Sequence, residues 1–150
     1  MGKRKNYNGV QINPSPTIVA PAGADIEDVR NKIMKFDTDG NLVLATAGTD
    51  MPMGVALIEE GYNDITGEES GKVVAGDDVT ILVKEMGVVI AGATIKAGQE
   101  VAAGADGLAA VAVAGDYVLG IALDNVEADE YLHIQLTKYQ KGGSAAAETE

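Results

Sequence analysis

The residues able to do chemistry are few and far apart in the sequence. The chain has one histidine, His133, and no cysteine, which excludes disulfides and thiolate metal sites. His133 lies in YLHIQLTKY (residues 131–139), where apolar and polar residues alternate, so we expect a surface histidine on a strand. A Ser-His-acid triad would require Ser15, Ser70 or Ser144 beside it, and these belong to an arm, a loop and a tail.

Carboxylates are plentiful, but their spacing indicates turns and solvated loops. DTDGN (residues 37–41) is similar to the start of a calcium loop. Counted from Asp37, however, the sixth and twelfth positions are Leu42 and Gly48, where an EF-hand needs Gly and Glu, so we expect a hairpin bend. A hydrolase using paired surface carboxylates stays open as a rival hypothesis. The adjacent acids are Glu59-Glu60, Glu68-Glu69, Asp77-Asp78 and Asp129-Glu130.

Composition and charge exclude further classes of protein. No GxGxxG or GxxxxGK[ST] phosphate loop is present, and we expect no catalytic residues, no metal site and no cofactor, hence a protein that is not an enzyme. The net charge is −12, and residues 23–150 hold all 23 acids against 8 bases, which disfavours nucleic acid as a partner. No apolar run approaches the roughly 18 residues of a membrane helix, so we expect no membrane partner.

The chain divides into an arm, a body and a tail. Residues 1–22 are predicted to form an extended N-terminal arm, because they contain three of the four prolines and no acid. Residues 23–140 form the body, and residues 141–150 a flexible tail. If the arm lies outside the body, removal of residues 2–20 leaves the body folded.

The body is predicted to be mainly β, a small barrel or sandwich with Gly-rich turns. Its side chains are small, with 19 Gly and one Phe in the chain. The stability of the fold must therefore come from many modest contacts or from surface buried against partners. We expect at most one short helix, over residues 24–33 with Asp25 as its cap. Strands are expected at residues 32–36, 41–45, 54–58, 79–85, 87–95, 117–123 and 131–139, with a hairpin over 100–113.

One part of the sequence is echoed later in the chain. Residues 39–48 match residues 106–115 at five of ten positions, and GVAL (residues 54–57) then corresponds to GIAL (residues 120–123). The apolar run inside the echo contains no nucleophile and no base. The echo therefore predicts architecture, a pseudo-repeat of two hairpin units, rather than a duplicated active site.

A short stretch resembles carrier domains. IKAGQEVAAGADG (residues 95–107) is similar to a bend in lipoyl and biotinyl carriers, which present a modified lysine in a tight turn, typically beside Met or Asp. VKEMG (residues 83–87) places Lys84 in an expected strand instead, which argues against a carrier. A small carrier or ligand-binding barrel remains the alternative function.

A broader resemblance covers residues 20–137. The segments that carry it are APAGADI (residues 20–26), IMKFDTDGNLVLATAG (33–48), VTILVKEMGVV (79–89) and the run from Ile95 to Leu136. In this order they resemble head decoration, or capsid cement, proteins of tailed bacteriophages, including the lambda-type stabilising proteins. The resemblance implies a structural protein made in the bacterial host and bound to the capsid exterior of the virion. It further implies a homo-oligomer, commonly a trimer, that stabilises the expanded shell.

The same resemblance implies an arm that orders against the major capsid protein. Basic residues suit an acidic partner surface, and apolar residues in an extended segment can anchor it on a neighbouring sheet. The predicted partner-binding residues are Lys3, Arg4, Lys5 and Tyr7, with Ile12, Ile18 and Val19 as apolar anchors.

Overall fold

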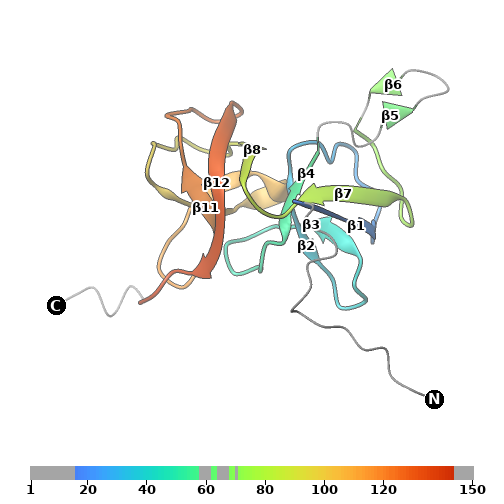
Figure 1. Ribbon diagram of the computed structural model, residues 1–150, viewed down its shortest axis with the longest axis horizontal. Coiled ribbons are helices and arrows are strands. Elements are labelled where there is room, and N and C mark those ends of the chain that lie inside the picture. Colours follow the sequence, from blue (N-terminus) through green and yellow to red (C-terminus); the bar gives the residue numbers. More distant parts are fainter. Residues whose placement is uncertain (1–15, 58–61, 64–67, 70, 144–150) are drawn as a thin grey trace, which may run out of the picture.

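Two five-stranded sheets, one from each half of the chain, lie side by side (Figure 1). The computed structural model describes residues 16–57, 62–63, 68–69 and 71–143. Apart from one 3-10 turn, η1 (Ala105–Gly107), all regular structure in these residues is β-strand. The prediction of a mainly β, sandwich-like fold is therefore confirmed.

The first sheet is built from the N-terminal half. Its order is β1-β7-β4-β2-β3, and every neighbouring pair is antiparallel. The chain segment that connects β4 to β7 contains a separate two-stranded hairpin, β5 (Tyr62–Asn63) with β6 (Glu68–Glu69). In Figure 1 this hairpin stands apart from both sheets. The five strands are β1 (Thr17–Pro21), β2 (Ile33–Phe36), β3 (Leu42–Leu44), β4 (Gly54–Ala56) and β7 (Asp78–Leu82).

The second sheet is built from the C-terminal half. Its order is β10-β9-β11-β12-β8, again with antiparallel neighbours throughout. Every strand expected from the sequence overlaps one strand of the two sheets; the sequence does not predict β1. The strands are β8 (Met86–Ile90), β9 (Glu100–Ala103), β10 (Ala109–Val111), β11 (Tyr117–Ala122) and β12 (Tyr131–Gln140).

The two sheets have one topology. In each half, the third, second, fourth, fifth and first main strands along the chain lie next to one another in that order. The pairing register is also the same. The first and fifth strands of each half form five residue pairs, and the central pair is Val19 with Thr80 in the first sheet and Val88 with His133 in the second. The predicted pseudo-repeat thus extends from a hairpin to five strands. We call residues 16–83 repeat 1 and residues 85–141 repeat 2.

The connections repeat as faithfully as the strands. Ile26 and Val73 exchange two backbone hydrogen bonds of 2.8 and 3.0 Å, and Ile95 and Val126 exchange two of 3.0 and 2.9 Å. The main difference is the loop before the last strand: 21 residues separate β4 from β7, whereas 8 separate β11 from β12. The β5–β6 hairpin is therefore an insertion that distinguishes repeat 1 from repeat 2.

Neither sheet closes into a barrel. Each curls until its first strand approaches its third, but only one parallel bridge joins them, Ala22 with Leu42 in repeat 1 and Ala91 with Ala109 in repeat 2. A ladder needs a succession of such pairs, so the barrel option of the prediction is not realised and the sandwich option is.

The core is continuous between the repeats. Ile33, Ala45 and Val55 of repeat 1, each at most 2% exposed, belong to the same buried cluster as Leu119 and Ile134 of repeat 2. A second cluster lies within repeat 1 and includes Met34, Leu42, Val79 and Ile81. Because the larger cluster draws on both sheets, each repeat buries part of the other's core.

The predicted short helix over residues 24–33 is wrong. Ile26 pairs with Val73 in an antiparallel bridge, and Asn31 adopts a left-handed backbone conformation with φ of 57°. Val29, in the same segment, is fully buried. A tertiary partner for the backbone of Ile26 therefore outweighs the weak helical preference of the sequence.

The predicted arm contributes its last residues to the first sheet. Thr17–Pro21 pair with β7 along the whole strand, and Ile18 and Ala20 pack against the second core cluster. Removal of residues 2–20 would therefore take most of β1 from the sheet, and the expectation that the body folds without them stays a prediction. Residues 1–15, with the rest of the predicted arm, and residues 144–150 of the predicted tail lie outside the described residues.

Candidate partner-binding surface

Only two of the predicted partner-binding residues fall in the described part of the chain. Ile18 is half-buried against the core of repeat 1, so its side chain serves the protein's own fold. Val19, the next residue of β1, has 57% of its surface exposed. The other five, Lys3, Arg4, Lys5, Tyr7 and Ile12, lie outside the described residues, and their contacts stay predictions.

β1 is an edge strand of the first sheet, and no strand of the described residues pairs with its outer side. Val83 donates to Pro16 O (2.8 Å) and Ala22 donates to Asp77 O (2.7 Å), which fixes the phase of the ladder. In an antiparallel pair, alternate residues bond to the neighbour, so Val19 directs its backbone N–H and C=O away from β7. Such an edge can accept another strand by backbone hydrogen bonds, with Val19 as an apolar contact.

The equivalent edge in repeat 2 is covered. Val88, at the position of Val19, accepts a hydrogen bond from Nδ2 of Asn31 (3.1 Å). A groove of about 250 Å³ follows this contact, between β4 and β8. Asn31 is 9% exposed, and its Oδ1 has no hydrogen-bond partner. The groove lining also includes Val55, Leu57, Leu82 and Met86.

His133 lies on the exposed face of β12, as the sequence predicts. Its Nδ1 is 2.6 Å from Oδ2 of Asp124, and both side chains are about half exposed. The backbone N–H of His133 also donates to this oxygen and, with the imidazole, lowers the pKa of Asp124 below its usual range. Ser15, Ser70 and Ser144 lie outside the described residues, so the structure does not test a triad with His133.

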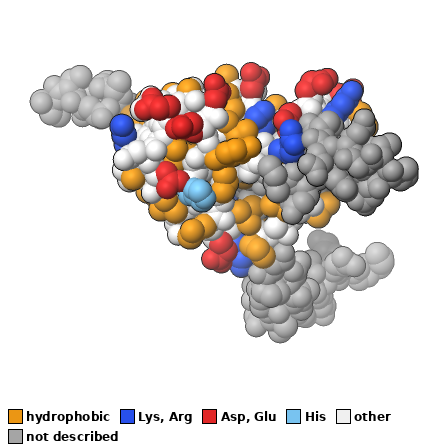
Figure 2. Space-filling view, turned by 90° about the horizontal axis from the view of Figure 1, so that it is seen from above, with side chains coloured by type: hydrophobic (Ala, Val, Ile, Leu, Met, Phe, Trp, Pro, Cys, Tyr) orange, Lys and Arg blue, Asp and Glu red, His pale blue; other side chains and the backbone are white. Residues whose placement is uncertain are grey.

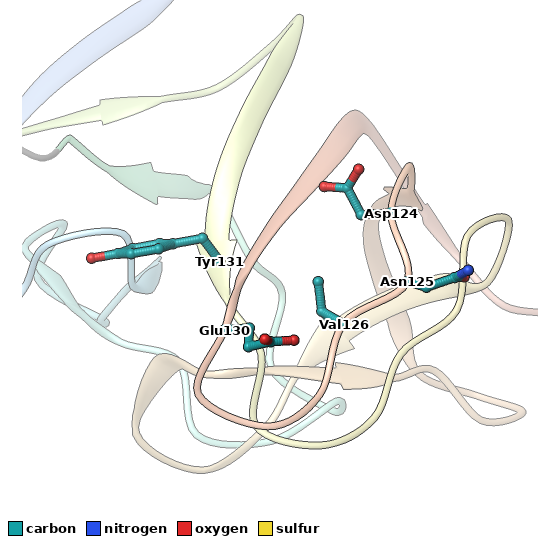
Figure 3. A pocket seen from close by; sticks show the side chains of 5 residues that line it. All are labelled: Asp124, Asn125, Val126, Glu130 and Tyr131. Carbon is teal, nitrogen blue, oxygen red and sulfur yellow. The ribbon is translucent and has the colours of Figure 1, made fainter.

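Several carboxylates of the described residues close turns through bonds to the backbone. Asp124 and Glu130 line an open depression of about 660 Å³. In Figure 3 their carboxylates point in different directions. Glu130 accepts the N–H of Glu127 (2.7 Å), which closes the turn before β12. No group of three or more metal-ligating side chains occurs among the described residues. The acid pair at 68–69 falls in β6, where the side chains are not described, and the pair at 59–60 is not described at all.

The bend over residues 37–41 is the hairpin that the sequence predicts. Oδ1 of Asp37 accepts the N–H groups of Asp39 and Asn41, both at 2.9 Å. This carboxylate closes the turn between β2 and β3 by hydrogen bonds to the backbone.

Lys84 is placed differently from the prediction. β7 ends at Leu82, so Lys84 is an exposed residue of the short connection between β7 and β8, where Glu85 has φ of 76°. The argument against a carrier domain that placed Lys84 inside a strand is therefore wrong. The connection joins two different sheets rather than two strands of one hairpin.

One face of the molecule carries many exposed hydrophobic side chains among polar and acidic ones. Figure 2 shows hydrophobic side chains across the middle of this face, with most of the carboxylates along its upper edge and a few among them. In the part of the chain that is described, no helix is long and apolar enough to cross a membrane.

Comparison with known proteins places this architecture. No protein-family model and no curated protein sequence matches the chain. Among solved structures there is a match. In fold, the chain is similar to the head fiber gp8.5 N base of bacteriophage phi29. The TM-score is 0.57 at 21% sequence identity, and the alignment covers 85% of this chain and 98% of the other. A phage head protein thus shares the fold, in agreement with the resemblance to phage head decoration proteins.

Sequence reasoning missed the features that define the surface. The open edge of β1 was hidden because Pro14, Pro16 and Pro21 suggested an arm, although proline is tolerated on an edge strand. The buried Asn31 stood in an expected helix. The echo is the signal that would have found β1. TIVAP (residues 17–21) forms the first strand of repeat 1, and MGVVI (residues 86–90) forms the first strand of repeat 2.

Proposed function

We propose that this protein is a structural component of a bacteriophage virion that binds the outside of the capsid and stabilises the expanded shell. The observation that carries the proposal is the likeness in fold to the base of a phage head fiber. The alignment covers 98% of the head fiber chain and 85% of this one. The acidic body suits a particle exterior, where net charge maintains solubility. No catalytic step is part of this role.

The major capsid protein is the proposed partner, and the N-terminal segment the proposed contact. Residues 1–22 carry the charges of Lys3, Arg4 and Lys5 and no acid, whereas the body is strongly acidic. Tyr7, Ile12 and the exposed Val19 would add apolar contacts. Self-association, as a trimer, would present several arms together and raise their effective concentration at the shell.

Stabilisation follows from selective binding. A protein that binds the expanded shell and not the unexpanded one favours the expanded state by RT ln(1 + [L]/Kd) at each site. At a hundredfold excess over Kd, this amounts to about 2.7 kcal/mol per site. Summed over many sites, such binding resists internal pressure without chemistry.

Reversal of the arm charges is expected to weaken attachment. The variant K3E/K5E should co-sediment with expanded heads less than the wild type, with the larger difference at low ionic strength, where charge is screened least. The matched control is K84E/K96E, which reverses two exposed lysines of the body. Unchanged binding of K3E/K5E at low salt would remove the basic cluster from the proposal, and equal binding to unexpanded heads would remove the stabilising role.

The carrier alternative rests on the exposed position of Lys84 beside Met86. Intact mass measurement after expression in a bacterial host distinguishes the two functions. We expect the mass of the unmodified chain. A lipoyl or biotinyl adduct that is lost in the variant K84R would replace the structural role with a carrier function.

A further inference from the structure

The two repeats meet through a defined pair of surfaces. Gly107 donates to Ala45 O (2.7 Å), Tyr117 donates to Gly48 O (2.8 Å), and Asn31 Nδ2 donates to Val88 O (3.1 Å). We call the surface on repeat 1 its docking face; it includes Asn31, Leu44, Ala47, Gly48 and Leu57. We call the surface on repeat 2 its edge face; it includes Val88, Gly107 and Tyr117. In Figure 1, β8 accordingly lies between β12 and the first sheet.

Because the repeats are equivalent, each also has the other kind of face. Equivalence follows from shared hydrogen bonds: Leu57 donates to Thr80 O as Leu123 donates to His133 O, which equates Leu57 with Leu123. By the same reasoning, the docking face of repeat 2 consists of Gly98, Val111, Val113, Ala114 and Leu123. The edge face of repeat 1 consists of Val19, Gly40 and Met51.

These two unused faces hold much of the exposed apolar surface. Ten large hydrophobic residues in the described part of the chain are exposed, and five of them lie on these faces. The counterparts of Val19, Met51, Val111 and Leu123 at the internal junction, namely Val88, Tyr117, Leu44 and Leu57, are all less exposed. The five residues and their exposed fractions are Val19 (57%), Met51 (54%), Val111 (36%), Val113 (62%) and Leu123 (43%). Apolar surface at the positions of an existing interface marks a second interface of the same kind.

We propose that the edge face of repeat 1 in one copy packs against the docking face of repeat 2 in another copy. The contact would reproduce the internal junction between the repeats. The open edge of β1 would then be covered as β8 is covered. The internal bond from Tyr117 to Gly48 would have its counterpart between Met51 N–H and Ala114 O. The occupant of both faces is therefore a second copy of this chain, joined head to tail.

The contact between copies is weaker than the internal one. Asn31, Ile33 and Leu82 of repeat 1 correspond to Gly98, Glu100 and Gln135 in repeat 2. A junction with Gln135 in place of Leu82 has less apolar contact. It also has fewer hydrogen bonds, because Gly98 cannot replace Asn31 and the N–H of Gly40, at the position of Gly107, already donates to Asp37 O (3.2 Å). Such a contact suits reversible association rather than a permanent polymer.

The charge of Glu100 is nevertheless compensated. Its carboxylate accepts the hydroxyl of Tyr139 and lies 2.9 Å from Nζ of Lys141, and these partners, Tyr139 first, lower its pKa. Tyr139 comes from the part of β12 that extends beyond the length of β7. The docking face of repeat 2 therefore carries no unpaired charge at the position of Ile33.

A head-to-tail contact has a symmetry consequence. An interface between two different faces closes into a ring when its rotation divides the circle, and otherwise continues as a chain. In a trimer, this contact would make a ring of six repeats joined by alternating internal and external junctions. The inference thereby gives a structural basis to the self-association in the proposed function, yet it needs no shell for its test.

The test is complementation between two variants. M51K spoils only the edge face and L123K only the docking face, so each should shift from oligomer to monomer in sedimentation or light scattering. An equimolar mixture should recover a heterodimer, because L123K retains the edge face and M51K retains the docking face. The control V74E alters an exposed residue (44%) whose counterpart in repeat 2 is Glu127, and it should assemble like the wild type.

Each outcome bears on the proposal separately from shell binding. A wild-type chain that is monomeric throughout a dilution series, variants that assemble normally, or a mixture that stays monomeric would each overturn it. Circular dichroism of each variant establishes that its fold is retained. Wild-type chains that assemble in this way but fail to co-sediment with heads would leave the inference standing and refute the proposed function.

Discussion

Replacement of Gly54 or Gly120 by alanine is expected to destabilise the whole chain by about 3 kcal/mol. The two glycines occupy equivalent places in β4 and β11. A Cβ on Gly54 would collide with the backbone carbonyl oxygen of Leu82, and one on Gly120 with that of Gln135. A backbone oxygen in a paired strand cannot move aside as a flexible side chain can, so the strands must separate.

Thermal unfolding followed by circular dichroism measures this effect. For a chain of this length, a loss of about 3 kcal/mol lowers Tm by roughly 6–12 °C. The control is Gly142→Ala, where an added Cβ meets nothing within 4 Å, and its Tm should equal that of the wild type. Because the larger core cluster joins both repeats, G54A and G120A should each unfold in a single transition. A Tm within a degree or two of wild type in both variants would contradict the close approach.

These glycines explain why the sequence states GVAL and GIAL at equivalent points. The close approach of the fourth and fifth strands requires glycine at Gly54 and Gly120, and the alanines two residues later, Ala56 and Ala122, are both buried. Elsewhere the repeats share pattern rather than identity. Val79 and Leu132, for example, are both fully buried at equivalent positions, although they are different residues. The echo found in the sequence is therefore the small part of the repeat where geometry dictates the residue.

The strands were predictable because alternation and Asp-Gly turns are local signals. The error over residues 24–33 has the opposite cause. Ile26, Val29 and Asn31 are placed by contacts with Val73 and Val88, which are distant in sequence. The prediction that Lys84 lies in a strand is wrong for a related reason. The alternation of apolar and polar residues continues past Leu82, where β7 ends and the chain passes to the second sheet.

The surface proposed for partners was only partly accessible to sequence reasoning. Basic composition marks residues 1–22 as different from the body, but it does not reveal that Thr17–Pro21 pair with β7. The faces proposed for self-association become visible only when the repeats are compared in three dimensions. Met51 and Tyr117 share no sequence feature, yet they follow equivalent turns closed by Asp50 and Asp116.

Two truncations separate the arm from the fold. Removal of residues 2–15 should leave the unfolding free energy unchanged, since the described sheet begins at Thr17. Removal of residues 2–21 should lower it by about 3–5 kcal/mol, a large part of the roughly 5–15 kcal/mol typical of a domain. The longer deletion takes away all five pairs between β1 and β7 and uncovers the core beneath Ile18 and Ala20. Each lost hydrogen bond contributes about 0.5–1.5 kcal/mol, and the lost burial adds to it.

Urea unfolding of the two truncated chains, beside the full chain, measures these differences. Co-sedimentation with expanded heads then assigns the function of the removed residues. If residues 2–15 hold the capsid contacts, the shorter truncation remains as stable as the full chain and fails to bind. If it binds fully, attachment resides in the body instead, and the exposed edge of β1 with Val19 becomes the site to vary next. Equal unfolding free energies of the two truncated chains would contradict the prediction that the pairing of β1 with β7 stabilises the sheet.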